Sequence, residues 1–386
     1  MSIIRLEVKG FRSLRDAVWE PGALNILIGP NAGGKSNLLK LLEMLQQSAE
    51  GRLKDYVMAS GGMGAVVCDG AHDGRIGVRV LAYRPFEDGE HWVDRAYDHA
   101  LELRRVGRSA EYQVAVETLS ADYKRDDNRE AARQLFARKL DVPDGAHTET
   151  LLSLARHPLD PFGDANDMRA FEGSWAVYQG FRSDPDCAIR GASIAAHHDR
   201  LEGDGANLAT YLHTLTAESR TLKDDVDSAM SAAFGEEYEE LLIRPVASQR
   251  VELAIRWRSR RNVAPAAELS DGTLRFLFLI AALANPEPPP LIAIDEPELG
   301  LHPSMFSIVA EFAAEASSRT QVGLTTHSPE FLDAFTDLGD RLTVTVVEAP
   351  AGATVLRNVS GESLDHWLKE YRLGEMFRSG TLEGLA

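Results

Sequence analysis

Several features of disulfide-linked, secreted and membrane proteins are missing from this sequence. Its two cysteines, Cys68 and Cys187, have no C-x-x-C or metal-type spacing, so neither a disulfide framework nor a zinc site is expected. The N-terminal segment, Met1 to Gly10, contains Arg5 and Lys9 and therefore lacks the apolar core of a signal peptide. No later apolar run approaches the ~18 residues of a membrane span. We expect a cytoplasmic protein that has no contact with a membrane.

Basic residues are also scarce. The chain has 41 Lys and Arg against 59 Asp and Glu, which gives a formal net charge of -18. Because such a charge repels polyanions at long range, any contact with nucleic acid must be local. The sequence shows no internal repeat and no heptad run long enough for a coiled coil. With 386 residues, of which 44% are hydrophobic, it predicts a globular chain of one or two domains.

The clearest motif that is present is a glycine-rich loop. Residues 29–36 fit the pattern G-x-x-x-x-G-K-[ST] and lie between a predicted strand, Asn25 to Ile28, and a predicted helix, Lys35 to Gln47. Glycines let successive backbone N–H groups point at phosphates, Lys35 can reach the terminal phosphates, and Ser36 can bind magnesium. The sequence therefore predicts a nucleotide site with these binding residues: Gly29, Pro30, Asn31, Ala32, Gly33, Gly34, Lys35, Ser36 and Asn37.

Two adjacent acids follow a second apolar strand, Leu291 to Ile294. Asp295, at the end of this strand, is predicted to hold the magnesium shell. Glu296 points the other way along the backbone and is predicted to orient and deprotonate the attacking water. Taken alone, two acids after a strand are equally consistent with a solvated turn, but the phosphate loop upstream favours the functional interpretation.

Together these segments resemble the ABC-type ATPases of the SMC, RecF and OLD group, and more narrowly the bacterial predicted ATPases of the AAA_21 type. The resemblance implies an α/β fold, namely an ABC-type P-loop head with a mixed sheet, an antiparallel N-terminal subdomain and an inserted α+β lobe. The segments that carry it are GFRSL (Gly10 to Leu14), LIGPNAGGKSNLL (Leu27 to Leu39), ELSDGTLRFLFLIAAL (Glu268 to Leu283), LIAIDEPELGLHP (Leu291 to Pro303) and LTTHSPEFLDAF (Leu324 to Phe335), with a weaker similarity in GDGANLATYLHTL (Gly203 to Leu215).

By this resemblance, Ser270 and Gly272 belong to a signature loop that contacts the γ-phosphate of ATP bound to the opposite subunit. The sequence adds a physical reason, because Ser270 stands at the N-cap of a helix that begins near Asp271, and a capped helix N-terminus suits phosphate. A plain helix cap is the alternative. The loop, LSDGT, departs from the transporter form LSGGQ at its third and fifth positions, so its contacts cannot be copied in detail.

Three further positions take roles from the resemblance. Glu298 to His302 resembles the D-loop that crosses the dimer interface. His327 resembles the switch histidine that senses the γ-phosphate, and it follows a predicted strand at the edge where nucleotide sites gather in α/β sheets. Arg12 resembles a position near the adenosine or phosphates, although a surface arginine on an edge strand remains open. Gln179 is one candidate for a Q-loop glutamine, but Gln46 and Gln47 lie on the helix after the phosphate loop, and none of the three is assigned.

The predicted function is ATP binding and hydrolysis, with Mg²⁺, by two copies that face each other around ATP; Lys35, Glu296 and His327 are the catalytic candidates. This homodimer is expected to serve DNA maintenance or defence against phage together with an effector protein. The alternative is a switch or scaffold that binds nucleotide without hydrolysis, and the retained Glu296 argues against it. A transporter subunit is disfavoured by the divergent signature loop. The residues after His327 contain no Asp-x-Asp pair, so we expect no Toprim-type metal site and no nuclease activity.

Double-stranded DNA is a possible partner through the basic cluster Arg256 to Arg261. On a strand, alternation would place Arg256, Arg258 and Arg260 on one face, with Trp257 available for stacking. A solvated strand face is the alternative, and the net acidity of the chain disfavours a DNA groove.

The domain organisation predicted from these motifs is a head made of residues 1–50 and 241–386 and an inserted lobe of residues 51–240. Within the lobe we predict an antiparallel meander over residues 74–119, and in the head we predict a hairpin over residues 241–257. Helices are predicted at Asn128 to Leu140, Glu149 to Ala155, Ala206 to Leu215, Leu222 to Phe234, Thr273 to Leu283, Ser304 to Ala316 and near Trp367, with a connection at His157 to Asp167.

Overall fold

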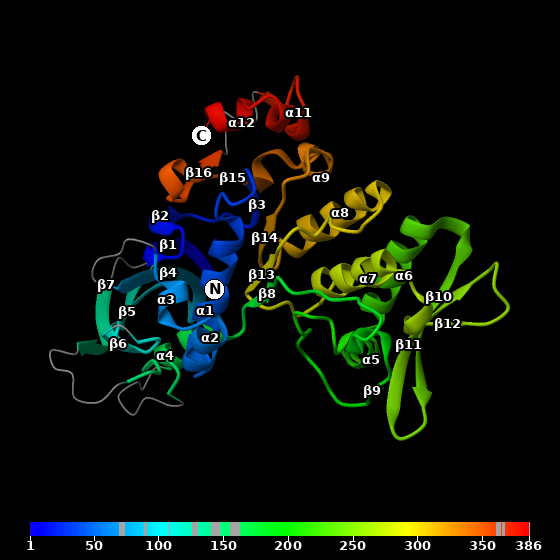
Figure 1. Ribbon diagram of the computed structural model, residues 1–386, viewed down its shortest axis with the longest axis horizontal. Helices are drawn as coiled ribbons and strands as arrows, with labels where there is room; N and C mark the ends of the chain where they lie inside the picture. The colour runs from blue at the N-terminus through cyan, green and yellow to red at the C-terminus, as the bar shows by residue number, and fades with distance from the viewer. Residues whose placement is uncertain are drawn as a thin grey trace. The chain divides into compact units, whose positions relative to one another are not determined.

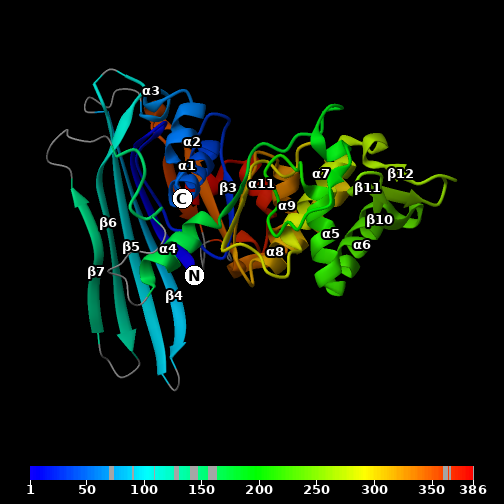
Figure 2. The ribbon, with the colours of Figure 1, turned by 90° about the horizontal axis from the view of Figure 1, so that it is seen from below.

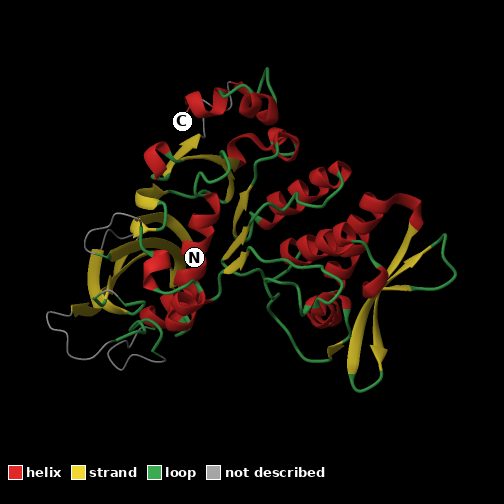
Figure 3. Ribbon diagram, in the orientation of Figure 1, coloured by secondary structure: helices red, strands yellow, loops and turns green. Residues whose placement is uncertain are grey.

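The computed structural model describes residues 1–68, 74–88, 91–107, 109–125, 130–139, 147–154, 163–359, 364 and 367–385. Helices and strands alternate along the chain (Figures 1 and 3), which confirms the mixed α/β class. The chain divides into two compact units. Unit 1 consists of Met1–Trp175 and Thr343–Val359, and unit 2 of Ala176–Leu342 and Ser360–Leu385. The predicted division into a head and an inserted lobe stays a prediction. No helix within the described part of the chain is both long and apolar enough to cross a membrane.

Unit 1 contains a six-stranded antiparallel sheet in the order β2-β1-β4-β5-β6-β7. Figure 2 shows its long strands side by side. The predicted antiparallel meander over residues 74–119 is thereby confirmed. The strands are β1 (Ser2–Phe11), β2 (Leu14–Trp19), β4 (Arg75–Asp88), β5 (His91–Arg105), β6 (Tyr112–Arg125) and β7 (Glu130–Lys139).

One face of this sheet is covered by helices (Figures 1 and 2). On β1 the side chains of Leu6, Val8 and Phe11 are buried, as expected for a strand with one face on a core. Of the helices that complete this core, three precede β4 in the sequence and one follows β7. They are α1 (Lys35–Ala49), α2 (Leu53–Ala59), α3 (Met63–Val66) and α4 (Asp164–Gly173).

Two of the predicted helices are wrong. Residues 128–140 were expected to be helical, yet β7 (Glu130–Lys139) pairs with β6 along its length. Residues 149–154 form turns, and residue 155 lies outside the described residues. The predicted connection at 157–167 also ends early, because α4 begins at Asp164; residues 157–162 are outside the described part.

Unit 1 holds a second group of strands, β3 (Leu24–Ile28), β15 (Leu342–Glu348) and β16 (Val355–Val359), in the order β16-β15-β3. All five residues of β3 are buried. The strand leads directly into the glycine-rich loop and then α1, so the predicted order of strand, loop and helix is confirmed. Chain from opposite ends of the sequence thus builds the support of this loop.

Unit 2 contains three parallel strands in the order β14-β13-β8, together with helices that include the predicted α5, α6, α7 and α8. The strands are β8 (Ala176–Tyr178), β13 (Leu291–Ile294) and β14 (Gln321–Thr325). The helices are α5 (Leu208–Glu218), α6 (Arg220–Phe234), α7 (Asp271–Leu283), α8 (Phe306–Ala316), α9 (Pro329–Asp333), α11 (Leu373–Arg378) and α12 (Thr381–Leu385). The helix predicted near Trp367 lies partly outside the described residues.

A small antiparallel sheet in unit 2 contains the predicted hairpin, and its strands are β9 (Ser193–Ile194), β10 (Tyr238–Val246), β11 (Arg250–Trp257) and β12 (Ala264–Pro265). The strand β11 ends at Trp257, so Arg258 and Arg260 lie in the following turn and do not share a strand face with Arg256. Trp257 packs edge-on against Phe234, with ring centroids 5.3 Å apart. The half-buried indole is therefore engaged in the packing of this unit, and its stacking on nucleic acid stays a prediction.

Candidate functional site

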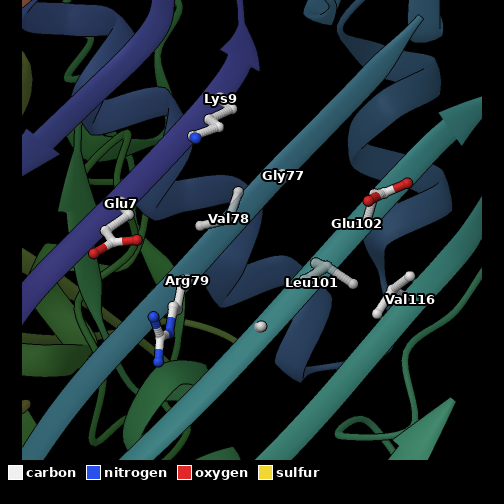
Figure 4. Close-up of a pocket in the computed structure, with 9 residues that line it drawn as sticks. Glu7, Lys9, Gly77, Val78, Arg79, Leu101, Glu102 and Val116 are labelled. Atoms are coloured by element: carbon white, nitrogen blue, oxygen red, sulfur yellow. The ribbon is translucent and has the colours of Figure 1, made fainter. Parts of the chain in front are cut away.

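The open face of the antiparallel sheet has a hollow that does not suit a nucleotide. Figure 4 shows it around Gly77 on β4, where the missing side chain leaves space between Lys9 and Glu102. Its volume is 210 Å³, and small-molecule sites usually measure about 300 to 1,000 Å³. Charged side chains there also pair with each other, as in Arg79 with Asp98 at 2.6 Å.

The phosphate loop in unit 1 is folded so tightly that two of its positions have no room for a side chain. A Cβ atom on Gly29 would lie 2.0 Å from the carbonyl oxygen of Val347. At Gly34 it would lie 2.0 Å from Oγ1 of Thr354, and the positive φ of 112° at Gly34 also disfavours other residues. These contacts explain why the motif requires glycine at both positions.

Lys35 and Ser36 begin α1, directly after this turn. The Lys35 side chain is buried, and its Nζ donates to the carbonyl oxygens of Gly29 at 2.7 Å and Pro30 at 3.2 Å. The ammonium therefore lies along the inner wall of the loop. A glycine cradle, a helix N-terminus and a lysine are the donor set that nucleotide phosphates require, and the Ser36 hydroxyl is the kind of hard oxygen ligand that Mg²⁺ prefers. The residues present fit both groups.

A chain of hydrogen bonds supports the loop from behind. Asn37 Nδ2 donates to Ser13 Oγ at 2.7 Å, Ser13 Oγ lies 2.7 Å from Thr354 Oγ1, and Thr354 Oγ1 donates to the carbonyl oxygen of Gly33 at 2.9 Å. Since each hydroxyl has one proton, Ser13 donates to Thr354 and the chain runs in one direction. The Asn37 side chain, predicted to bind nucleotide, is thus occupied with holding the loop in shape.

Arg12 lies in the same turn as Ser13, between β1 and β2. Its φ is 49°, and its backbone N–H donates to the carbonyl oxygen of Val66 at 2.8 Å. The guanidinium carbon lies 5.9 Å from the centre of the Phe11 ring, and its buried Nε has no hydrogen-bond partner among the described residues. Arg12 is therefore partly enclosed rather than a freely solvated arginine, and its role toward a nucleotide stays a prediction.

In unit 2 the ends of the parallel strands bring the predicted acids together with a residue that the sequence did not reveal. The Thr325 hydroxyl, at the end of β14, donates to Asp295 Oδ1 at 2.5 Å and accepts the backbone N–H of Glu296 at 3.0 Å. Because β13 and β14 are parallel and in register at Ile294 and Leu324, their carboxyl ends place these groups side by side. One hydroxyl thus fixes both acids.

Glu296 is further held by its backbone and by His327. Its φ is 46°, a left-handed conformation that costs a non-glycine residue about 1 to 3 kcal/mol. Arg275 on α7 donates from Nη2 to the Glu296 carbonyl oxygen at 2.8 Å. The carboxylate Oε1 lies 3.1 Å from Nδ1 of His327, so the structure brings the predicted base and the predicted switch histidine into contact.

The D-loop segment that follows is anchored by a buried carboxyl group. Glu298 accepts from Thr326 Oγ1 at 2.5 Å, and burial raises the pKa of Glu298 although this hydrogen bond opposes the shift. Further along, Gly300 approaches the signature loop, because a Cβ atom on Gly272 would lie 2.6 Å from the Gly300 carbonyl oxygen. The predicted signature and D-loop residues are therefore neighbours within unit 2.

The predicted N-cap at Ser270 is confirmed. Helix α7 begins at Asp271, and Ser270 Oγ accepts the backbone N–H of Thr273 at 3.1 Å. Of the two interpretations of this serine, the structure shows the helix cap; contact with a nucleotide stays a prediction.

Gln179 follows β8, and its neighbour Tyr178 contacts Asp295, the predicted magnesium ligand. Tyr178, the last residue of β8, accepts the backbone N–H of Asp295 at 2.9 Å. β8 and β13 are parallel, so Gln179 leaves the sheet beside Asp295. The strand has only three residues, so sequence periodicity does not reveal it, and the assignment of a Q-loop glutamine stays a prediction.

Comparisons with known proteins show the family to which the chain belongs. A model of a family described as "AAA domain, putative AbiEii toxin, Type IV TA system" matches residues 74–333, about two thirds of the chain. The match includes the acids, the signature loop and His327, while the phosphate loop precedes it. No match was found among curated proteins.

Similar solved structures are heads of SMC proteins. One is an SMC head bound to the C-winged helix domain of ScpA, at 15% identity over 94% of this chain and 99% of that chain, with a TM-score of 0.53. Another is an Smc head domain with an extended coiled coil bound to the C-terminal domain of ScpA from Pyrococcus furiosus, at 14% identity over 96% and 99% of the two chains, with a TM-score of 0.50.

Fold and motif residues define the class of the protein as an ABC-type P-loop ATPase with the fold of an SMC head. Within that class, the chain belongs to the AAA_21 family, whose members carry a nucleotide-binding ATPase domain.

Proposed function

We propose that this protein hydrolyses ATP with Glu296 as the general base. The observation that supports this most strongly is the fixed arrangement at the ends of β13 and β14. There Thr325 holds Asp295 and the Glu296 backbone, while His327 contacts the Glu296 carboxylate at 3.1 Å. A carboxylate held in one orientation can accept a proton from the attacking water, which is the task of a general base.

We further propose that the phosphates lie against the backbone N–H groups of the loop from Gly29 to Asn37, with Lys35 donating to the terminal phosphates. Ser36 through its hydroxyl and Asp295 through its carboxylate are the proposed ligands of Mg²⁺, which offsets phosphate charge when bound. His327 holds the Glu296 carboxylate and senses the terminal phosphate.

The active assembly that we propose is a homodimer in which Ser270 and Gly272 of one subunit contact the ATP of the other. Gly272 and the D-loop glycine Gly300 are neighbours in unit 2, which supports a common surface for the second subunit. The SMC heads solved with a ScpA domain support a protein partner as well.

For the cellular role we propose DNA maintenance or defence against phage, exercised with an effector protein. The description of the family names a putative toxin of a toxin–antitoxin system, which supports defence. Double-stranded DNA is the less supported partner. Exposed Arg256 and Arg258 favour it, but the net charge of -18 and the packed Trp257 do not.

The decisive experiment compares the native chain with Glu296→Gln, with Glu311→Gln as the matched control on the exposed side of α8. Turnover of ATP and molecular mass are measured with and without double-stranded DNA. We expect Glu296→Gln to lose about 100-fold or more in turnover. It should also accumulate ATP-dependent dimers, while Glu311→Gln behaves as the native chain.

Three other outcomes have distinct meanings. If the native chain binds ATP and changes mass but shows no turnover, the non-hydrolysing switch is correct instead. Unchanged turnover in Glu296→Gln would remove this residue as the base. Stimulation of turnover by DNA would favour DNA maintenance over a purely protein-directed role.

A further inference from the structure

Arg190 stands out because all three nitrogens of its guanidinium group make hydrogen bonds, and one of them donates to backbone carbonyls of a distant segment. It ends a short 3-10 helix, Ala188–Arg190, in unit 2. Its side chain is only 11% exposed. The preceding residue, Ile189, is buried at 3% exposure and anchors the turn. The arginine is therefore held in one place by its own backbone.

Three of its hydrogen bonds go to carbonyl oxygens just before the signature loop. Nη1 donates to Leu269 at 2.8 Å, to Ala266 at 3.2 Å and to Ala267 at 3.3 Å. These carbonyls belong to the 3-10 turn Ala266–Glu268 and to the residue that leads into the N-cap of α7. One guanidinium nitrogen thus binds three carbonyl oxygens of the segment before α7 and holds the start of this helix in place.

The remaining N–H donors of Arg190 contact a carboxylate and a carbonyl oxygen of a second segment. Nη2 contacts Asp271 Oδ1 at 2.5 Å, and Nε donates to the carbonyl oxygen of Ser183 at 2.7 Å. Asp271 occupies the third position of the signature loop, where the transporter form has glycine. A carboxylate at the first residue of a helix opposes the approach of a phosphate, and Arg190 neutralises that charge.

We propose that Arg190 is a positioning residue of the signature loop: it sets the backbone of Ala266 to Asp271 and masks the Asp271 carboxylate so that the loop can receive the phosphate of a partner subunit. This inference rests on the proposed dimeric ATPase. It also accounts for the departure from the LSGGQ form, because the Asp271 carboxylate has its compensating cation on another segment.

The bond to Ser183 gives Arg190 a second connection. Ser183 lies four positions after Gln179, in the segment that leaves β8 beside Asp295. Arg190 therefore ties this segment to the signature loop. Only an arginine has the planar, five-donor group needed for all these contacts, since a lysine offers three donors around one atom.

The test uses Arg190→Met and Arg190→Lys, with Arg182→Met as the matched control. Arg182 lies eight positions earlier, and its exposed side chain pairs only with Asp184 among the contacts described for it. We expect Arg190→Met to keep the affinity of the isolated subunit for ATP, because its phosphate loop is intact. Turnover should fall by about 100-fold, as for other misplaced site groups, and ATP-dependent dimers should be lost. Arg190→Lys should recover part of the turnover, and Arg182→Met should match the native chain.

A mixing experiment separates positioning from general damage. Arg190→Met has an intact phosphate loop and a misplaced signature loop, whereas Lys35→Ala has the reverse. If the two loops act across the dimer, an equal mixture of these inactive variants regains turnover through one complete site. If native ATP-dependent dimers form but the mixture stays inactive, or if Arg190→Met retains native turnover, the role of Arg190 is refuted. If the native chain itself shows no ATP-dependent dimer, the proposed function fails instead.

Discussion

At the scale of single residues, the hydroxyl of Thr325 has more influence on the proposed chemistry than its small size suggests. It is fully buried, and it contacts both Asp295 and the backbone of Glu296. Thr325→Val keeps the shape and removes both hydrogen bonds. We expect turnover to fall about 10- to 100-fold because the acids lose their orientation, while ATP affinity changes little. Steady-state kinetics and equilibrium ATP binding measure the two quantities separately.

Thr345→Val is the matched control for this prediction. Thr345 is also fully buried on a strand, and its hydroxyl lies 2.8 Å from Asn358 Oδ1, away from the motif residues. Thr325→Val should lose about 1 to 3 kcal/mol in the free energy of unfolding, since it leaves buried polar groups without their partner, whereas Thr345→Val should lose less because water can replace the hydroxyl at the exposed Asn358. Equal losses of turnover in the two variants would show that Thr325 contributes only to stability.

At this scale, the sequence predicts only those residues that belong to local sequence patterns. Lys35, Asp295 and Glu296 stand at fixed positions after an apolar strand, so their pattern was sufficient. Thr325 and Arg190 could not be found in this way, because they act through hydrogen bonds across 29 and 79 positions. Neither residue carries a motif of its own.

At the scale of helices, a comparison of two serine caps separates an effect on stability from an effect on turnover. Ser270 caps α7 and Ser219 caps α6, each by accepting a backbone N–H three residues on. Ser270→Ala and Ser219→Ala should each lose about 1 kcal/mol of stability by the same mechanism, measured by thermal or chemical unfolding. Only Ser270→Ala should also lose turnover, because only this cap lies in the proposed phosphate-contacting loop. A native turnover in Ser270→Ala would leave the cap as its entire role.

A buried charged cluster joins three elements of unit 1. His99 on β5 contacts Glu172 on α4 at 2.9 Å and lies 3.7 Å from Glu117 on β6, and all three side chains are buried. Burial alone would lower the pKa of His99, but the two carboxylates outweigh it and raise the pKa to about 10. The imidazole is therefore a cation in the folded protein at neutral pH.

The pH dependence of stability follows from this shift. Because the folded pKa of His99 lies above the usual 6.5, its contribution is complete below pH 6.5 and is lost as the pH rises toward about 10. We expect the free energy of unfolding of the native chain to fall over this range, and His99→Gln to lack this component of the slope. At pH 7 the variant should be less stable by about 3 to 5 kcal/mol, since the carboxylates lose their cation. Denaturant titrations across this pH range provide the measurement.

The wrong helix at residues 128–140 has a physical explanation. Its sequence, with Ala131, Ala132, Leu135 and Ala137, has the residue types that favour helices locally. In the structure these residues complete the ladder beside β6, with Leu119 opposite Phe136. Pairing with a strand already in place outweighed local propensity, and no single-sequence pattern carries that information.

At the scale of the whole molecule, the charge of -18 opposes the proposed dimer. Two copies repel each other most strongly at low ionic strength, where the Debye length is about 30 Å at 0.01 M and about 8 Å at 0.15 M. We expect the ATP-dependent dimer to become tighter as salt is raised across this range, measured as the dissociation constant at saturating ATP. A dimer that is tighter at low salt would instead indicate complementary charges at the interface.

The mixed class and the order of the motifs were predictable, because strand, loop and helix signals are local. The composition of the compact units was not. Unit 1 takes the segment Thr343–Val359 from far along the chain, and this depends on contacts such as that between Thr354 and Gly33.

That contact has a consequence for how the protein is made. Gly33 and Thr354 are 321 positions apart, so during synthesis the phosphate loop is completed long after its own residues have emerged. At roughly 5 to 20 residues per second the delay is about 16 to 64 seconds. Until then ATP has no finished loop to bind and cannot stabilise the nascent chain by mass action. In a cell that contains ATP, the nucleotide would therefore protect finished chains and leave truncated ones to proteolysis.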